Sequence, residues 1–275
     1  MAIVSGPNTR SEGSGLRFLR DLGWSLRAWK KAPLFVVFTA CLYAADAARV
    51  PFLGTLILLF RVGFSGTQWL FYLSVFTGTQ LLMGDALSAT KEYVGRYLRL
   101  GLLVVGTWVY PIVIYVAIRW AREHPDGQHQ AIPIPTWARV TVLLGSFVLD
   151  VLLTFVGPAL AFSTTSVFEA LRSGLSYLRR SLPSSAWYVL TPGLTLSTGF
   201  LVFPNTVLGT SHTFAIAVFG GMAGFAFKGA IAAFYLRAHP EIPGRTSYAV
   251  PARWLHRWES DRDARELLAR GPLSR

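Results

Sequence analysis

The chain has 275 residues, of which 52% are hydrophobic and only 15% are charged. Soluble domains carry about 25% charged residues, so this composition excludes a water-soluble globule with an ordinary polar surface. The net charge of +12 would suit nucleic acid, but the basic residues lie mainly between and outside long apolar blocks. This distribution is the positive-inside pattern of a membrane protein, and we expect no binding of nucleic acid.

The N-terminal segment, residues 1–33, is polar and basic and has no apolar stretch ending in a small-residue cleavage site. We therefore expect no cleaved signal peptide. Apolar residues recur in it at i, i+3, i+7 and i+10, which is one face of a helix. They are Leu19, Leu22, Leu26 and Trp29. The basic pair Lys30 and Lys31 follows, so we expect a cytoplasmic amphipathic "elbow" helix in the headgroup plane.

Six apolar blocks are candidates for the roughly 20 residues that cross a bilayer. They cover residues 34–60, 67–83, 100–118, 140–162, 186–206 and 213–236. The first block is interrupted by Asp46, Arg49 and Pro51, so it is either one kinked helix or a helix followed by a re-entrant segment. The sequence thus predicts an all-α, polytopic membrane helical bundle over residues 34–237.

The distribution of Lys and Arg predicts the orientation of the chain. Of 26 such residues, twenty fall in the N-terminal segment, in the connections after the second and fourth blocks, and in the C-terminal tail. Four fall in the other connections, and Arg49 and Lys228 lie within blocks. This asymmetry predicts a multi-pass protein of a bacterial inner membrane with both termini in the cytoplasm.

The elbow pattern recurs before two more blocks. Before residues 186–206 it comprises Phe168, Leu171, Leu175 and Leu178, followed by Arg179 and Arg180. A weaker copy before residues 100–118 comprises Leu87, Thr90, Val94 and Tyr97, and ends at Arg99. The pattern predicts three parallel units, each an elbow helix leading into a transmembrane hairpin. The open alternative is that any loop entering a bilayer is basic and amphipathic.

Residues 168–174, with the sequence FEALRSG, follow the sequence GPALAF at residues 157–162. This stretch resembles the E-A-L-R-x-S elbow of bacterial multi-helix membrane-domain families. Those domains are attached to some glycerophosphodiester phosphodiesterases and also occur as stand-alone relatives. The resemblance covers about residues 140–206, and Gly174 stands where a larger residue is usual. Because the chain carries no phosphodiesterase catalytic domain, the resemblance implies an architecture and no activity.

Four ionisable residues within the blocks are candidate functional groups, because burying charge in a bilayer is costly. Asp46 and Arg49 are three residues apart and share a helix face, so they suit a self-neutralising pair. Asp150 has no local basic neighbour. It is either a protonated, hydrogen-bonded acid or the partner of Lys228, which alternatively extends towards the cytoplasmic interface.

The spacing of Gly220 and Gly224 is typical of close helix packing in membranes. We interpret it as packing within the chain rather than between two copies. The chain has no HExxH, GxSxG or GxxxxGK[ST] motif. Its only cysteine is Cys41, and its five histidines all lie outside the cores of the blocks. We therefore expect no metal, no cofactor and no catalysis.

The tail, residues 238–275, contains Trp254, Leu255 and Trp258 followed by alternating charges. This pattern suits a helix that lies on the membrane, docks onto the elbows or binds a separate protein. Three hypotheses of function follow. The first is a non-catalytic accessory, scaffold or lipid-interacting protein, and the second is a small-solute or ion transporter that uses the four intramembrane charges. The third is a lipid-modifying enzyme, for which the polar group comprises Asp85, Lys91, Glu92 and Arg96.

Overall fold

A computed structural model describes residues 13–47, 54–123, 136–202, 210–240, 242 and 249–269. All regular secondary structure in these ranges is helical. The elements are α1 (Ser14–Trp29), α2 (Pro33–Ala47), α3 (Gly54–Thr77), α4 (Met83–Val104), the π-helical segment η1 (Val105–Val109), α5 (Tyr110–Glu123), α6 (Thr136–Leu153), α7 (Val156–Phe162), α8 (Val167–Val202), α9 (Thr210–Ala238) and α10 (Ala252–Ala269). The prediction of an all-α protein is therefore confirmed.

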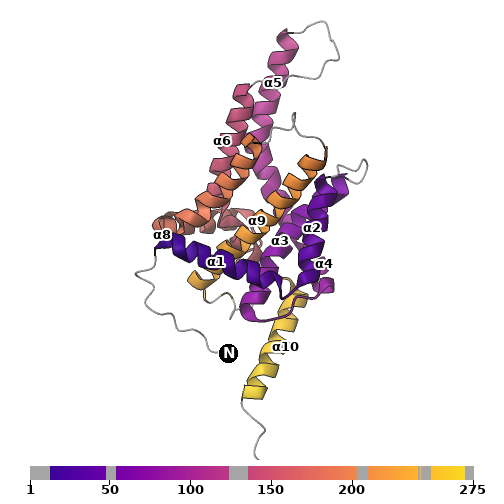
Figure 1. The fold of residues 1–275 in the computed structure, drawn as a ribbon, viewed down its shortest axis with the longest axis vertical. Helices are drawn as coiled ribbons and strands as arrows, with labels where there is room; N and C mark the ends of the chain where they lie inside the picture. The colour runs from indigo at the N-terminus through magenta and orange to yellow at the C-terminus, as the bar shows by residue number, and fades with distance from the viewer. Residues whose placement is uncertain are drawn as a thin grey trace, which may run out of the picture.

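The helices form an elongated bundle (Figure 1). α5 and α6 extend to one end of its long axis, and α10 extends to the other. α1 lies across the bundle, where it packs against α8 and α9. α2 and α3 pack against each other and against α9. α9 is therefore the helix on which the N-terminal and C-terminal parts of the chain meet.

Two helices in the described ranges are long and apolar enough to cross a membrane, Leu56–Thr77 in α3 and Val218–Ala238 in α9. Two bent pairs raise the number to four if each pair is one span. They are Met83–Trp108 with Tyr110–Arg122, bent by 40°, and Leu144–Leu153 with Val156–Phe162, bent by 41°. The structure thus gives two to four candidate spans.

The boundaries of the first two predicted spans are wrong. The predicted block 34–60 contains the whole of α2 after Pro33 and also the start of α3, which begins at Gly54 rather than near residue 67. α2 has 15 residues, fewer than the roughly 20 that cross a bilayer. The choice between a kinked helix and a re-entrant segment depends on residues 48–53, which lie outside the described residues.

Only the first of the three elbows is a separate helix. α1 ends at Trp29, and Pro33 begins α2, because proline fits the first turn of a helix, where its missing N–H is not needed. The second elbow continues into the fifth block as the 36-residue α8, which accommodates Pro183 and Pro192 in its interior. No residue described in this helix has the positive φ angle that would reverse the chain.

The third predicted elbow does not lie apart from the bundle, because α4 packs along α3 in the opposite direction. Gly78, with a φ of 75°, ends α3 in the left-handed region that favours glycine. Across the two helices, the Thr67 and Thr90 hydroxyls lie 2.9 Å apart. The Tyr93 hydroxyl donates to the Ala161 carbonyl of α7 at 3.0 Å. The predicted stripe does not face outward as a whole, since Thr90 and Tyr97 are 1% and 8% exposed whereas Leu87 is 41% exposed.

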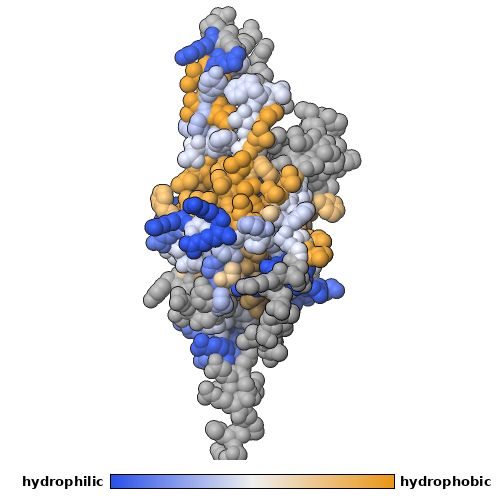
Figure 2. Space-filling view, turned by 90° about the vertical axis from the view of Figure 1, so that its left-hand side faces the viewer, coloured by the Kyte–Doolittle hydropathy of each residue, from blue (hydrophilic) through white to orange (hydrophobic). Residues whose placement is uncertain are grey.

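α1 carries three of its leucines on the outside and two polar side chains on the inside. Asp21 and Ser25 are 1% and 0% exposed, whereas Leu16, Leu19 and Leu26 are 68%, 61% and 45% exposed. A helix on a water-soluble protein has the opposite arrangement. Figure 2 shows a broad hydrophobic band across one side of the molecule, with hydrophilic side chains above and below it. The outer surface of this band suits an apolar solvent.

Candidate functional site

Of the four charged residues that the sequence singles out, the structure describes the side chains of Asp150 and Lys228, which lie apart. The side chain of Asp46 and the whole of Arg49 lie outside the described residues, so their pairing remains a prediction. Asp150 is exposed on α6 and faces α8, where a Cβ built at Gly193 would lie 4.0 Å from the Asp150 Cβ. Lys228 lies on α9 and is directed towards α3. The expected Asp150–Lys228 ion pair is not formed.

The Lys228 amine is held by α3 instead. Its Nζ donates to Ser65 Oγ at 2.7 Å and to Gln68 Oε1 at 2.7 Å. It also lies 5.9 Å from the centre of the Trp69 ring, within the range of a cation–π contact. Residues 65 and 68 share a face of α3, because they are three apart on a helix. The Lys228 amine therefore has neutral oxygens of α3 as its partners, in place of Asp150 or the cytoplasmic interface.

A cavity of about 120 Å³ lies at this point between α2, α3 and α9. Besides Lys228, it is lined by Leu42, Tyr43, Arg61, Phe64, Ser65 and Gln68. The Arg61 guanidinium lies 5.5 Å from the centre of the Tyr43 ring, and Gln68 Nε2 donates to the Tyr43 hydroxyl at 3.2 Å. Arg61 is one of the four basic residues that the predicted blocks place in the other connections. Because α3 begins at Gly54, Arg61 belongs to the helix and to the cavity.

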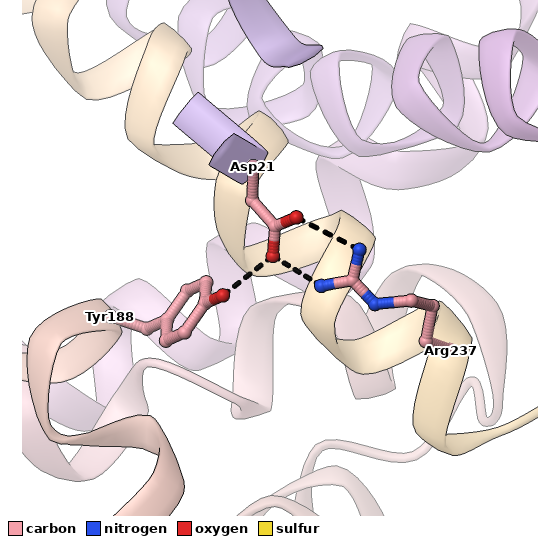
Figure 3. Close-up of polar contacts among 3 residues, drawn as sticks. All are labelled: Asp21, Tyr188 and Arg237. Atoms are coloured by element: carbon pink, nitrogen blue, oxygen red, sulfur yellow. Dashed lines mark hydrogen bonds and ion pairs between the residues drawn. The ribbon is translucent and has the colours of Figure 1, made fainter. Parts of the chain in front are cut away.

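A second polar site, the Asp21 triad, joins three helices and comprises Asp21 of α1, Tyr188 of α8 and Arg237 of α9 (Figure 3). Arg237 Nη1 donates to Asp21 Oδ1 at 2.8 Å, and Arg237 Nη2 pairs with Asp21 Oδ2. The Tyr188 hydroxyl donates to Asp21 Oδ2 at 2.5 Å. A two-pronged arginine–carboxylate contact fixes both position and angle. The triad therefore holds the elbow helix α1 against the two last long helices.

Sequence reasoning missed the Asp21 triad because its members stood in separate segments: Asp21 in the N-terminal segment, and Tyr188 and Arg237 at the edges of two predicted blocks. One signal was present, since Asp21 is the only acidic residue of α1, among Arg17, Arg20 and Arg27. It also lies off the leucine stripe. An isolated acid on the polar face of a cationic helix is a candidate for burial against a distant cation.

The Tyr72 hydroxyl joins α1, α3 and α9. Ser25 Oγ and Trp29 Nε1 each donate to it at 3.0 Å, and it donates to the Phe225 carbonyl at 2.8 Å. Gly229 lies beside this centre, where a Cβ would come within 3.0 Å of the Ser25 side chain and the Tyr72 ring. The polar face of α1 is thus buried because its hydroxyl and indole groups have partners inside the bundle.

The predicted packing role of Gly220 and Gly224 is wrong for contacts within the described chain. A Cβ built at either residue meets no heavy atom within 4 Å. Close approach occurs instead at Gly221, where a Cβ would come within 3.0 Å of the Tyr43 ring, and at Gly229. Gly220 and Gly224 do have the four-residue spacing, but Gly221 and Gly229 lie on the face of α9 that meets α1 and α2.

The tail docks on α4 through the polar group proposed for an enzyme. Arg257 Nε pairs with Asp85 Oδ2 at 3.2 Å, and Arg96 Nη1 donates to the Ala249 carbonyl. Trp254 and Trp258 of α10 are 3% and 8% exposed. Of the alternatives for the tail, the structure shows docking within the chain, onto the α4 helix that contains the third elbow. Asp85 and Arg96 hold the tail, which leaves the exposed Lys91 and Glu92 as the remainder of that polar group.

Replacing Trp258 with Ala is expected to release the tail. Removing a buried tryptophan costs about 3–5 kcal/mol. Each 1.4 kcal/mol raises the population in which α10 is detached from α4 by a factor of about ten. Trypsin should therefore cleave the arginines of α10 at least about tenfold faster, as measured by mass spectrometry over time. His256→Ala is the matched control, because the His256 side chain is 81% exposed. Equal cleavage of both variants would contradict the docked tail.

Comparison with protein-family models, with curated proteins and with solved structures finds no match for this chain. The resemblance of residues 168–174 to the phosphodiesterase-associated membrane domains therefore stays a prediction. The interpretation of the protein rests on its own residues: an apolar outer band, a cavity with two cations, and the Asp21 triad.

Proposed function

We propose that the protein is a multi-span component of a bacterial inner membrane that interacts with lipid and acts as an accessory or scaffold rather than as a catalyst. In this proposal six segments cross the bilayer as three hairpins, and both termini lie in the cytoplasm. α2 then crosses as a short span, and the two bent helix pairs each count as one.

The observation that carries the proposal is the inverted surface of α1. Its exposed residues include three leucines beside Arg20 and Arg27, and its buried residues include an aspartate and a serine. Burial of apolar surface contributes about 25 cal/mol per Å² to folding in water. A helix facing water would therefore turn these leucines inward. In hydrocarbon that driving force is absent, and polar groups seek partners inside the protein. α8 repeats the feature with Phe168, which is 74% exposed.

The cations near the elbows support an interaction with anionic lipid. Arg27, Lys30 and Lys31 are exposed at the end of α1, and Arg179 and Arg180 are exposed in α8. A basic residue near an anionic membrane surface contributes about 1 kcal/mol of attraction. The outward leucines and these cations together suit the boundary between headgroups and acyl chains.

The single cysteine allows the topology to be tested. Cys41 is exposed on α2 and would face lipid, so an impermeant maleimide should label the native protein only after denaturation. In a Cys41→Ala background, Lys30→Cys should react only when the cytoplasmic side is accessible, as in inverted vesicles. Arg122→Cys, at the end of α5, should react in intact cells. Labelling of both sites from one side would contradict the proposed orientation.

Resistance to extraction tests membrane residence itself. The protein should stay with the membrane pellet in alkaline carbonate and require detergent for solubility, because its outer band has no partner in water. A monodisperse polypeptide in detergent-free buffer would refute the proposal.

Transport is the second candidate, and the observation that favours it is the cavity beside Lys228. A path lined by all four predicted charges is not supported, since Asp150 lies on α6 beside α8 and Lys228 lies on α9 beside α3. Transport through the cavity would require uptake of solute into proteoliposomes that is lost in Lys228→Met. Asp150→Asn should leave such uptake unchanged.

A further inference from the structure

We infer that the cavity between α2, α3 and α9 binds a small anion, with the Lys228 ammonium as its principal contact. This inference goes beyond membrane residence and lipid interaction, and it concerns a site within the bundle. It rests on the charge balance of the cavity, on the donors that line it, and on its volume.

The charge of Lys228 is incompletely compensated. In the described part of the chain, its amine contacts two neutral oxygens and an aromatic ring, and no carboxylate lies within ion-pair distance. A buried ammonium gains from a negative charge at hydrogen-bond distance. An anion in the cavity would supply that charge to Lys228.

The remaining lining groups suit an anion as well. An ammonium has three protons, of which Ser65 and Gln68 take two, so one remains for a ligand. Ser65 adds a hydroxyl group, whose proton can turn towards an acceptor. Leu42 and Phe64 close the other walls with apolar surface, which excludes water and strengthens charge-assisted hydrogen bonds.

The volume limits the ligand class. About 120 Å³ is far below the 300–1,000 Å³ typical of pockets for drug-sized molecules. It has room for a halide, nitrate, a short carboxylate or inorganic phosphate. These ions share one chemistry: a compact negative charge that accepts several short hydrogen bonds. A nucleotide or a whole lipid headgroup would not fit.

The experiment measures thermal unfolding of the full-length protein in detergent while chloride, nitrate, acetate or phosphate replaces gluconate at constant ionic strength. Gluconate is too large for the cavity. A ligand that binds only the folded state raises the melting temperature with the logarithm of its concentration. We expect at least one small anion to do so, and Lys228→Met to weaken that effect at least about tenfold, as loss of a charged hydrogen bond implies.

Three variants make the result specific. Lys228→Arg should retain the response because it keeps the charge, and Lys91→Met, an exposed lysine on α4, should retain it as the matched control. Leu42→Phe fills the cavity without touching Lys228 and should abolish the response, which provides the test if Lys228→Met does not fold. An anion response that survives both Lys228→Met and Leu42→Phe would overturn the inference. So would the absence of any response in the wild-type protein.

Iodide gives an independent readout. An iodide on the Lys228 amine would lie close to the Trp69 ring, whose centre is 5.9 Å from that amine. Saturable quenching of fluorescence that disappears in Trp69→Phe is expected. Quenching that rises linearly with iodide and is equal in both proteins would show collisions alone and would count against the site.

Discussion

Replacing Arg237 with Met is expected to lower the free energy of unfolding by about 3–5 kcal/mol, because it leaves a buried charge without its counterion. The Asp21 side chain is only 2% exposed, so its carboxylate cannot turn to water. Tyr188 alone would remain as its hydrogen-bond partner. Unfolding of the purified protein in detergent, followed by intrinsic fluorescence against denaturant or temperature, measures the loss.

The reciprocal change should cost less. Asp21→Asn leaves Arg237 unpaired, but the Arg237 side chain is 40% exposed and can reach solvent or headgroups. We expect a loss of about 1–3 kcal/mol, the cost of a charged hydrogen bond. Arg237→Lys should fall between the two, since a lysine cannot make the two-pronged contact. Arg180→Met, at an exposed position of α8, is the control. A greater loss in Asp21→Asn than in Arg237→Met would contradict the buried ion pair.

The second large effect is expected at Gly229. Gly229→Ala should lower the free energy of unfolding by about 2 kcal/mol or more, because the added methyl group would come within 3.0 Å of Ser25 and Tyr72. Both neighbours belong to the hydrogen-bonded centre at the Tyr72 hydroxyl. The methyl group therefore has to separate α1 from α9 or break that centre. The same unfolding measurement applies.

Gly224→Ala is the matched control on the same helix. Nothing lies within 4 Å of a Cβ at Gly224, and alanine is the better helix former by about 1 kcal/mol. We expect its stability to be unchanged or slightly raised. If Gly224→Ala were the more harmful of the two, that face of α9 would be the tightly packed one, as the sequence spacing had predicted.

The helical class and the apolar outer surface could be predicted because they depend on composition and on short-range periodicity. The elbow stripe of α1 shows how far that goes. Leu19 and Leu26 were correctly placed on one helix face, and the structure has both exposed. What the stripe could not reveal was the opposite face, where Asp21 and Ser25 are buried against residues more than 150 positions away or across another helix.

The ends of helices were harder to predict than their existence. Hydropathy is averaged over many residues, so the charged interruption near Asp46 did not reveal that α2 ends at Ala47 and α3 begins at Gly54. This error moved Arg61 from α3 into a loop and hid its position beside Lys228. The predicted pairing of Lys228 with Asp150 was also wrong, because a carboxylate is the usual partner of a buried ammonium. Ser65 and Gln68 instead present neutral oxygens that accept hydrogen bonds from the ammonium, because they share a face of α3.

The Asp21 triad has a consequence for biosynthesis. Asp21 and Arg237 are separated by 216 positions, and a ribosome adds about 5–20 residues per second. α1 is then made roughly ten to forty seconds before the counterion of Asp21. A chain arrested before α9 would lack that counterion, so α1 is secured in the bundle only after α9 has been made.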